Sequence, residues 1–324
     1  MKEILDKEDF IFNTRVKQKV FYNNNEVKLA EVQEILKNAT ELMREFEEKL
    51  SFYKDSSEVS SINKKASKGF TKVSRETFEI LRKAIDYSKL TNGIFDITIA
   101  PLVKAWAINS DNPIILEGKK VDELINLVDY EDIILNENNL SVMLLRENQK
   151  IDLGGIAKGY IADKVIELYK ENNIKSAIIN IGGNIKTLGE KDENTLWNVG
   201  IYEPKKHSEK VICSIEVKNK SVVTSGGYER AFSYNGELYC HILNPRTGYP
   251  IKSDLKSISI VSDESIDGDA LSTPLFIMGT NKAYEYMKKH NISGVMITEE
   301  DEIIVTNDLL EGFKLFQDYK VLSF

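Results

Sequence analysis

The segment Ile151-Asp-Leu-Gly-Gly-Ile-Ala-Lys-Gly-Tyr160 leads into apolar residues at helical spacing, from Ile161 to Leu168, and then into a strand-like run, Ala177 to Ile181. Glycines at the start of a helix let the backbone approach a ligand closely, and the free N–H groups there attract phosphate. Two interpretations are open. The segment is an anion-binding turn in which Asp152 contacts a ligand, or it is a tight turn in which Asp152 caps the helix.

The elements on either side of this segment mix helices and strands without a regular alternation. The glycine spacing matches neither the dinucleotide-binding fingerprint nor the P-loop, so a doubly wound nucleotide fold is not indicated. The other predicted elements are helices from Val32 to Leu50 and from an N-cap at Ser74 to Leu90, strands at 133–135 and 142–145, a hairpin around Asn235-Gly236, and a last hairpin joining 295–298 to 303–305. This order favours an α+β fold of mixed sheets and packed helices.

The composition excludes several classes of protein. The 324 residues carry 43 Lys plus Arg and 51 Asp plus Glu, a net charge of −8, which argues against a nucleic-acid binder. Two cysteines, Cys213 and Cys240, are too few for a disulfide framework or a zinc site. No apolar run is long enough for a membrane span, and charges interrupt the N-terminal ten residues where a signal peptide needs an apolar stretch.

The segment Ile266-Asp-Gly-Asp-Ala-Leu-Ser-Thr-Pro274 is a candidate cation site. On a helix, Asp269 and Thr273 share one face, and a carboxylate beside a hydroxyl offers the oxygen ligands that Mg²⁺ prefers. Pro274 leaves the carbonyl of Ala270 without its helical donor. The alternative is that Asp267 or Asp269 only caps the helix, which we expect to stop at Gly279.

A third group of residues lies at the ends of predicted strands. His241 stands where a strand enters the Pro/Gly-bounded turn before Pro250, either as a structural histidine or as a base. Glycine pairs stand earlier in the chain, at 182–183 and 226–227. Asp96 is a lone carboxylate in an apolar stretch. Each motif alone is compatible with a bulge or a turn.

Taken in order, these motifs resemble the ApbE-type FAD:protein FMN transferases, from about Phe12 to past Gly279. The resemblance is carried by Tyr53-Lys-Asp-Ser-Ser-Glu-Val-Ser-Ser-Ile-Asn63, Gly93-Ile-Phe-Asp96, Asp152-Leu-Gly-Gly-Ile-Ala-Lys-Gly159, Asn180-Ile-Gly-Gly-Asn184, Thr224-Ser-Gly-Gly-Tyr228, His241-Ile-Leu-Asn-Pro-Arg-Thr-Gly248 and Asp269-Ala-Leu-Ser-Thr273.

The resemblance implies a Mg²⁺-dependent enzyme that moves the FMN half of FAD onto a Ser or Thr hydroxyl of an acceptor protein and releases AMP. It implies that the Gly155 carbonyl, Asp269 and Thr273 hold the metal, with Ser272 close by, and that His241 is the base. Asp269 and His241 are thus the expected catalytic residues. The expected contacts to FAD are Phe12, Tyr53, Ile94, Phe95, Asp96, Asp152, Lys158 and Leu243.

Some features depart from this family. Phe12-Asn-Thr14 stands where many members have Met-Gly-Thr or Met-Asn-Thr, Asn244 stands where Asp is frequent, and Pro274 replaces a small helix former. Many members begin with a lipoprotein signal and a cysteine, whereas the first cysteine here is Cys213, so we expect a cytoplasmic protein. The alternative is a lipoprotein whose native signal has been removed, because its sequence would also begin without a signal and a cysteine.

The expected organisation is one catalytic domain over residues 1–324, with 1–11 a loosely attached segment. The chain has no Ser/Thr-Gly-Ala-Thr sequence of the kind this family modifies, so we expect a separate acceptor protein that carries it. Two alternatives share the same binding residues: an FAD pyrophosphatase that yields free FMN and AMP, and a non-catalytic FAD-binding protein.

Overall fold

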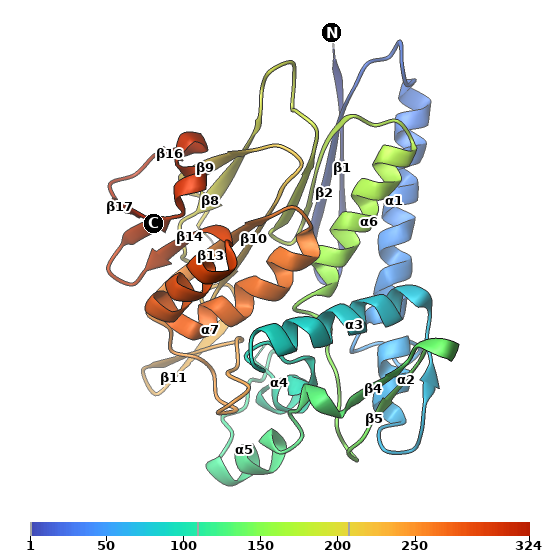
Figure 1. Ribbon diagram of the computed structural model, residues 1–324, viewed down its shortest axis with the longest axis vertical. Helices are drawn as coiled ribbons and strands as arrows, with labels where there is room; N and C mark the ends of the chain where they lie inside the picture. The colour runs from blue at the N-terminus through green and yellow to red at the C-terminus, as the bar shows by residue number, and fades with distance from the viewer. Residues whose placement is uncertain (1, 109, 207) are drawn as a thin grey trace.

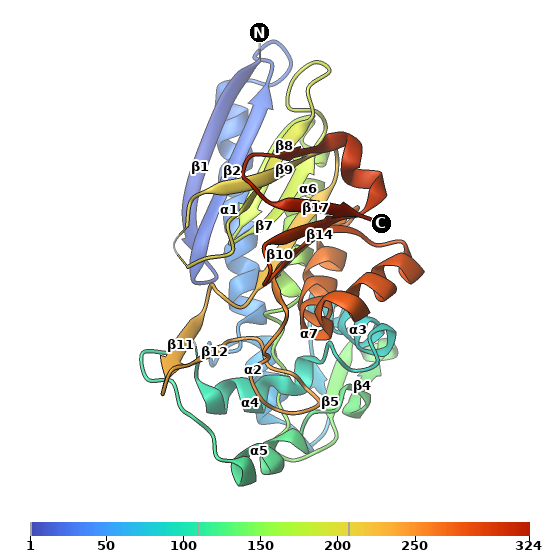
Figure 2. The ribbon, with the colours of Figure 1, turned by 90° about the vertical axis from the view of Figure 1, so that its left-hand side faces the viewer.

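A large sheet forms the centre of the computed structural model, which describes residues 2–108, 110–206 and 208–324 (Figures 1 and 2). Neighbouring strands are antiparallel except for the last pair, which is parallel. In spatial order the strands are β1 (Glu3–Ile11), β2 (Thr14–Tyr22), β6 (Ser176–Ile181), β7 (Asn184–Leu188), β10 (Ser221–Gly226), β13 (Leu255–Ser262), β14 (Ser293–Thr298), β15 (Glu302–Val305) and β17 (Lys320–Ser323).

Both faces of this sheet are covered. Because side chains alternate along a strand, Ile179 and Ile181 of β6 enter one core while Ile178 packs against another. The first core lies under helices α1 (Leu29–Leu50), α6 (Ala157–Glu171) and the start of α7 (Ser265–His290). The second lies under a small sheet of β8 (Trp197–Tyr202), β9 (Val211–Val217) and β16 (Phe313–Leu315).

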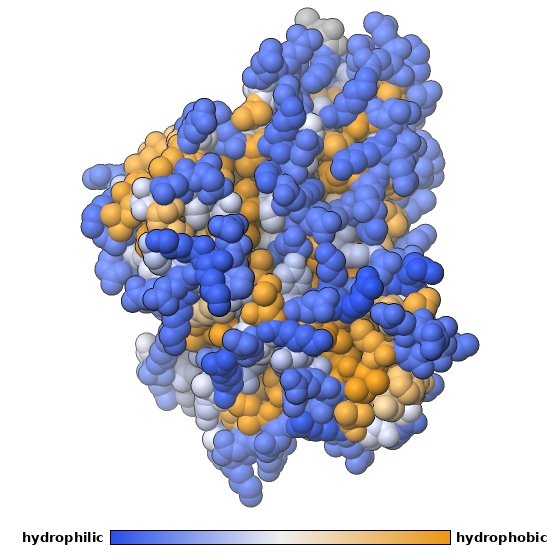
Figure 3. Space-filling model, viewed as in Figure 1, coloured by the Kyte–Doolittle hydropathy of each residue, from blue (hydrophilic) through white to orange (hydrophobic). Residues whose placement is uncertain are grey.

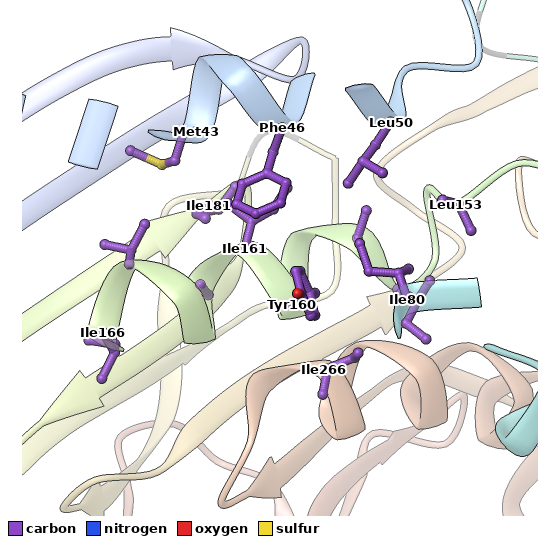
Figure 4. Close-up of a cluster of buried hydrophobic side chains, with 14 of the residues drawn as sticks. Met43, Phe46, Leu50, Ile80, Leu153, Tyr160, Ile161, Ile166, Ile181 and Ile266 are labelled. Carbon is purple, nitrogen blue, oxygen red and sulfur yellow. The ribbon is translucent and has the colours of Figure 1, made fainter. Parts of the chain in front are cut away.

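Figure 4 shows the first core, where Phe46 of α1 reaches Tyr160 and Ile161 of α6. The rings of Phe46 and Tyr160 meet edge to face with their centroids 5.7 Å apart. On the outside, polar and charged residues cover most of the face in Figure 3. The interior position of α6 explains why apolar residues surround the glycine-rich segment that precedes it.

A second group of elements lies at one end of the large sheet (Figure 1). It comprises α2 (Glu58–Lys64), α3 (Arg75–Leu90), α4 (Ala100–Trp106), α5 (Gly118–Ile125) and a small sheet of β3 (Thr71–Lys72), β5 (Ser141–Leu144) and β4 (Ile133–Asn136). Short 3₁₀ turns occur at Ile97–Ile99, Tyr130–Asp132, Glu137–Asn139 and Asn307–Gly312. The hairpin of β11 (Ala231–Tyr234) and β12 (Glu237–Cys240) lies beside this group (Figure 2).

The α+β class is confirmed, as are the helices predicted near the N-terminus. The hydroxyl of Ser74 accepts the N–H of Thr77 and caps α3. Asn235 and Gly236 have φ angles of 49° and 80°, so both turn residues of the predicted hairpin are left-handed. Gly279 ends its helix as expected: with φ 75° and ψ 174° it separates the first helical segment of α7 from a second one that continues to His290.

The structure corrects the prediction for the N-terminal segment. Residues 1–11 were expected to be loosely attached, but Glu3–Ile11 form β1, which pairs along its whole length with β2. Tyr22 donates a hydrogen bond to Glu3 at 2.8 Å, and Lys7 binds Thr40 of α1. The charges of this segment lie on an edge strand, where charged side chains protect against pairing with other chains.

Candidate functional site

A pocket of about 410 Å³ opens between the large sheet and the helical end of the molecule. Segments far apart in the sequence line it: the β1–β2 turn, the end of α1, the 152–158 turn, the end of β10, the residues after β12, and α7. The predicted site residues that line the pocket are Phe12, Tyr53, Ile94, Phe95, Asp96, Asp152, Gly155, Lys158, His241, Leu243, Asp269 and Thr273. Ser272 is the exception.

Asp269 is a buried carboxylate at the crossing of α6 and α7, only 5% exposed. Its Oδ2 accepts the backbone N–H of Gly159 at 2.9 Å. In a regular helix that N–H would bind the carbonyl of Gly155, four residues earlier. Among the described residues no backbone N–H donates to the Gly155 carbonyl, so Asp269 leaves this oxygen available beside the pocket.

The start of α7 is capped by Asp163 of α6. The Asp163 carboxylate accepts the N–H groups of Ser265 and Ile266 at 2.8 and 2.9 Å. The position before the helix is Glu264, whose side chain makes no capping hydrogen bond. The interpretation of Asp267 or Asp269 as a simple helix cap is therefore wrong, and α7 presents Asp269 from its second turn.

Lys158 brings the cationic group of the site. Its ammonium donates to the carbonyl of Gly154 at 2.9 Å and lies 3.4 Å from Oδ1 of Asp269. The side chain is partly buried, so the ion pair is less screened than one on the surface. An anion that enters the pocket meets this ammonium beside the glycine-rich turn.

Three hydroxyl groups lie behind and beside Asp269. Ser225 donates to Ser272 at 2.9 Å, and its oxygen lies 3.2 Å from that of Thr273. Because a hydroxyl has one proton, Thr273 must donate to Ser225, which leaves the lone pairs of Thr273 free. Ser272 itself donates to the Asp269 carbonyl at 3.3 Å and is buried, so it supports the site from outside the pocket.

Asp96 and Asp152 have different surroundings. Asp96 accepts the N–H of Thr98 at 2.8 Å, the hydroxyl of Thr98 at 2.6 Å and the N–H of Tyr130 at 3.0 Å. Burial raises the pKa of Asp96 to about 6, although these hydrogen bonds act in the opposite direction. Asp152 accepts the N–H of Gly154 at 2.9 Å, its one hydrogen bond within residues 2–108, 110–206 and 208–324, and burial raises its pKa. Asp152 does not cap α6, which begins five residues later.

The apolar contacts line different parts of the pocket. Phe95 is buried, and a Cβ on Gly155 would lie 3.4 Å from its ring, so the glycine-rich turn packs closely on this aromatic side chain. Tyr53 is 72% exposed and meets Phe52 edge to face. Leu243 is buried and follows the hairpin of β11 and β12. The pocket thus has a buried aromatic wall and an exposed aromatic residue.

His241 directly follows β12. Its Nδ1 lies 3.2 Å from the carbonyl of Arg230, and because a carbonyl only accepts, Nδ1 carries the proton and Nε2 is the basic nitrogen. Burial, followed by the positive charge of Arg230, lowers the pKa of His241 to about 4. The imidazole is therefore neutral at pH 7 and able to accept a proton.

Other pocket residues carried no signal in the sequence. Glu47, Glu229 and Arg230 line the pocket, but each looks like an ordinary charged surface residue. The glycine pair before Glu229 was the only local indication. Arg246 lies outside the pocket and donates to the carbonyl of Asn92 at 3.1 Å, so it joins two loops.

Comparison with known proteins gives a consistent result. The model of the ApbE family matches residues 12–296. The chain belongs to this family. It is 34% identical over 268 residues to the FAD:protein FMN transferase of Klebsiella pneumoniae, an alignment that covers 82% of this chain and 83% of that one. The corresponding protein of Treponema pallidum is 32% identical over 273 residues, 80% of this chain and 75% of that one.

The crystal structure of the ApbE protein from Thermotoga maritima has the same fold. The two structures superpose with a TM-score of 0.86 at 28% sequence identity. The alignment covers 94% of this chain and 98% of the Thermotoga maritima chain. The segment matched by the ApbE family model begins at Phe12 and extends past Ile277, so it contains the residues that line the pocket.

Proposed function

We propose that this ApbE-family chain transfers the FMN half of FAD to a Ser or Thr hydroxyl of a separate acceptor protein, with Mg²⁺, and releases AMP. One observation carries the proposal: a buried carboxylate, a cationic ammonium and a neutral histidine lie in the same pocket. Relatives named FAD:protein FMN transferase, at 34% and 32% identity, support it.

The donor set suits Mg²⁺. Asp269, the hydroxyl of Thr273 and the free carbonyl of Gly155 supply three oxygen ligands of the kind that this ion takes. Among the described residues no group of three or more His, Cys, Asp or Glu side chains could hold a metal, and the donor set proposed here contains a single carboxylate, that of Asp269. Such sites suit an ion that is completed by substrate phosphates and water. When bound, Mg²⁺ would neutralise charge on the pyrophosphate.

Side chains of this protein would carry out the remaining steps, which are binding of the pyrophosphate and removal of the proton. The Lys158 ammonium binds and orients the pyrophosphate. Nε2 of His241 accepts the proton of the acceptor hydroxyl, whose oxygen forms a bond to the FMN phosphorus. The bond from this phosphorus to the oxygen of AMP breaks, and AMP leaves with that oxygen. General-base assistance of this kind typically contributes roughly 10²- to 10⁴-fold in rate.

We further propose that the chain acts as one catalytic unit. The walls of the pocket come from residues between Phe12 and Ile277, and one continuous sheet joins the N-terminal strands, through the pairing of β2 with β6, to the later ones. No helix among the described residues has the length and apolar character that a membrane crossing needs.

The test uses FAD, Mg²⁺ and an acceptor domain with a Ser/Thr-Gly-Ala-Thr sequence. We expect an FMN mass addition on the acceptor and an equal amount of AMP, and no addition to a control acceptor in which Ala replaces the modified Ser or Thr. Free FMN and AMP without an adduct would assign an FAD pyrophosphatase instead. Bound but unchanged FAD would assign a binding protein.

A further inference from the structure

The turn between β1 and β2 carries a bulky residue in a left-handed conformation. Phe12 and Asn13 have φ angles of 56° and 52°, and the flanking residues Ile11 and Thr14 pair directly. Two-residue hairpin turns of this kind favour Asn and Gly, and positive φ is disfavoured for an aromatic L-residue, by roughly 5- to 30-fold in population. Phe12 lines the pocket, so the strained residue is also a site residue.

Glu47 of α1 holds this turn in place. Its Oε1 accepts the backbone N–H of Phe12 at 2.7 Å, and its Oε2 accepts the ammonium of Lys54 at 3.1 Å. The side chain of Glu47 is 23% exposed and lines the pocket. Lys54 directly follows Tyr53, so one carboxylate contacts the turn of Phe12 and the loop of Tyr53.

We propose that Glu47 is a positioning residue that fixes the Phe12 turn and the Tyr53 loop as two walls of the flavin pocket. This inference rests on the proposed function, because FAD is the ligand whose affinity it concerns. A charge-assisted hydrogen bond to the Phe12 N–H offsets the unfavourable backbone conformation and keeps that aromatic side chain at the pocket. Without it, the hairpin tip would relax, and FAD binding would have to restore the geometry.

Glu48 provides a matched control. It also binds the Lys54 ammonium, at 2.6 Å, but makes no contact with the Phe12 turn. Glu47→Ala removes both contacts of Glu47. Glu47→Gln keeps an oxygen that can accept the Phe12 N–H, whereas Glu48→Ala removes only an ion pair to Lys54.

The experiment measures the FAD dissociation constant by flavin fluorescence, together with thermal unfolding and the transfer rate at saturating FAD. Loss of a charge-assisted hydrogen bond corresponds to roughly 10- to 100-fold. We expect Glu47→Ala to weaken FAD binding by that factor with little change in kcat, Glu47→Gln to restore most of the affinity, and Glu48→Ala to bind like wild type. Phe12→Gly removes the ring that lines the pocket and packs on the first core, so it should bind FAD more weakly.

The inference is overturned if Glu47→Ala binds FAD as wild type does, or if Glu48→Ala weakens binding equally, because the Lys54 ion pair would then account for the effect. It is also overturned if Phe12→Gly keeps wild-type affinity. If the wild-type protein binds FAD and transfers FMN while these variants are unaffected, the proposed function remains intact. A wild-type protein that binds no FAD refutes the proposed function, and this inference with it.

Discussion

Replacing Gly159 by Ala tests the crossing of α6 and α7 on which the site depends. A Cβ at this position would lie 2.4 Å from the carbonyl oxygen of Ser265 and 2.6 Å from the Cα of Ile266. Both are backbone atoms, so no side-chain rotation can relieve the contact. The two helices must separate by about 1 Å to restore ordinary van der Waals spacing.

The expected effect on stability is small. Overpacking of this kind costs about 1–3 kcal/mol, while Ala is favoured over Gly within a helix by about 1 kcal/mol. The free energy of unfolding should therefore fall by no more than about 2 kcal/mol. The expected effect on transfer is larger, because Asp269 lies on the displaced helix and binds the N–H of Gly159 itself. A displacement of about 1 Å at a reacting site can reduce the rate about 100-fold.

The assay follows the FMN adduct on the acceptor by mass spectrometry, and urea unfolding measures stability. Gly118→Ala is the matched control, because Gly118 lies in α5, outside the pocket, and a Cβ there would be at an ordinary 3.6 Å from the Tyr249 hydroxyl. That variant should transfer FMN at the wild-type rate. If Gly159→Ala also keeps the wild-type rate, the close crossing does not position Asp269 and the reasoning is refuted.

Three further outcomes are expected. Asp269→Asn keeps an acceptor for the Gly159 N–H but loses the charge, so the protein should stay folded by circular dichroism while Mg²⁺-dependent transfer disappears; transfer at the wild-type rate would contradict the metal assignment. Asp163→Ala removes the carboxylate that accepts two N–H groups of α7 and lies 3.4 Å from the buried ammonium of Lys186. Urea unfolding should show a fall of about 3–5 kcal/mol in the free energy of unfolding. A fall below about 1 kcal/mol would contradict the role of Asp163 as the cap of α7. Because burial and then Arg230 lower the pKa of His241 to about 4, its neutral form persists on acidification well below the usual value of 6.5, whereas Asp96, whose pKa burial raises to about 6, titrates earlier; in an Asp96→Asn background kcat/KM should therefore stay level down to about pH 5 and fall towards pH 4, and an acid limb centred near 6.5 in that background would argue against His241 as the base.

Local elements could be predicted because their signals lie in contiguous residues. The apolar spacing of α1, the Ser74 cap and the Asn235-Gly236 turn each depend on a few neighbouring positions. The order of strands could not, because β2 pairs with β6 across more than 150 residues, and nothing in either strand specifies the other. β1 was missed for a related reason: the alternation of an edge strand is weak when its exposed side chains are charged.

The site residues also fall into those that a local sequence pattern predicts and those that it does not. Asp269, Lys158 and His241 stand in glycine- or proline-bounded motifs, whose backbone requirements leave a pattern in the sequence. Glu47 and Asp163 lie within helices and look like solvated carboxylates. Their roles depend on N–H groups supplied by distant elements, the β1–β2 turn and the start of α7, and no local pattern records this pairing.

The number of hydrogen-bond donors distinguishes Asp269 from Asp96 as a carboxylate that could hold a cation. Asp96 already accepts three hydrogen bonds from its own loop and from Tyr130, so a metal there would have to displace the contacts that shape that wall. Asp269 uses Oδ2 for the Gly159 N–H, and its Oδ1 faces only the Lys158 ammonium at 3.4 Å, a long contact. Lys158 also has the Gly154 carbonyl at 2.9 Å as a partner. On the proposed function, Oδ1 of Asp269 is therefore the oxygen that would exchange the ammonium for a divalent ion while the bond from Oδ2 to Gly159 keeps the helix crossing in place.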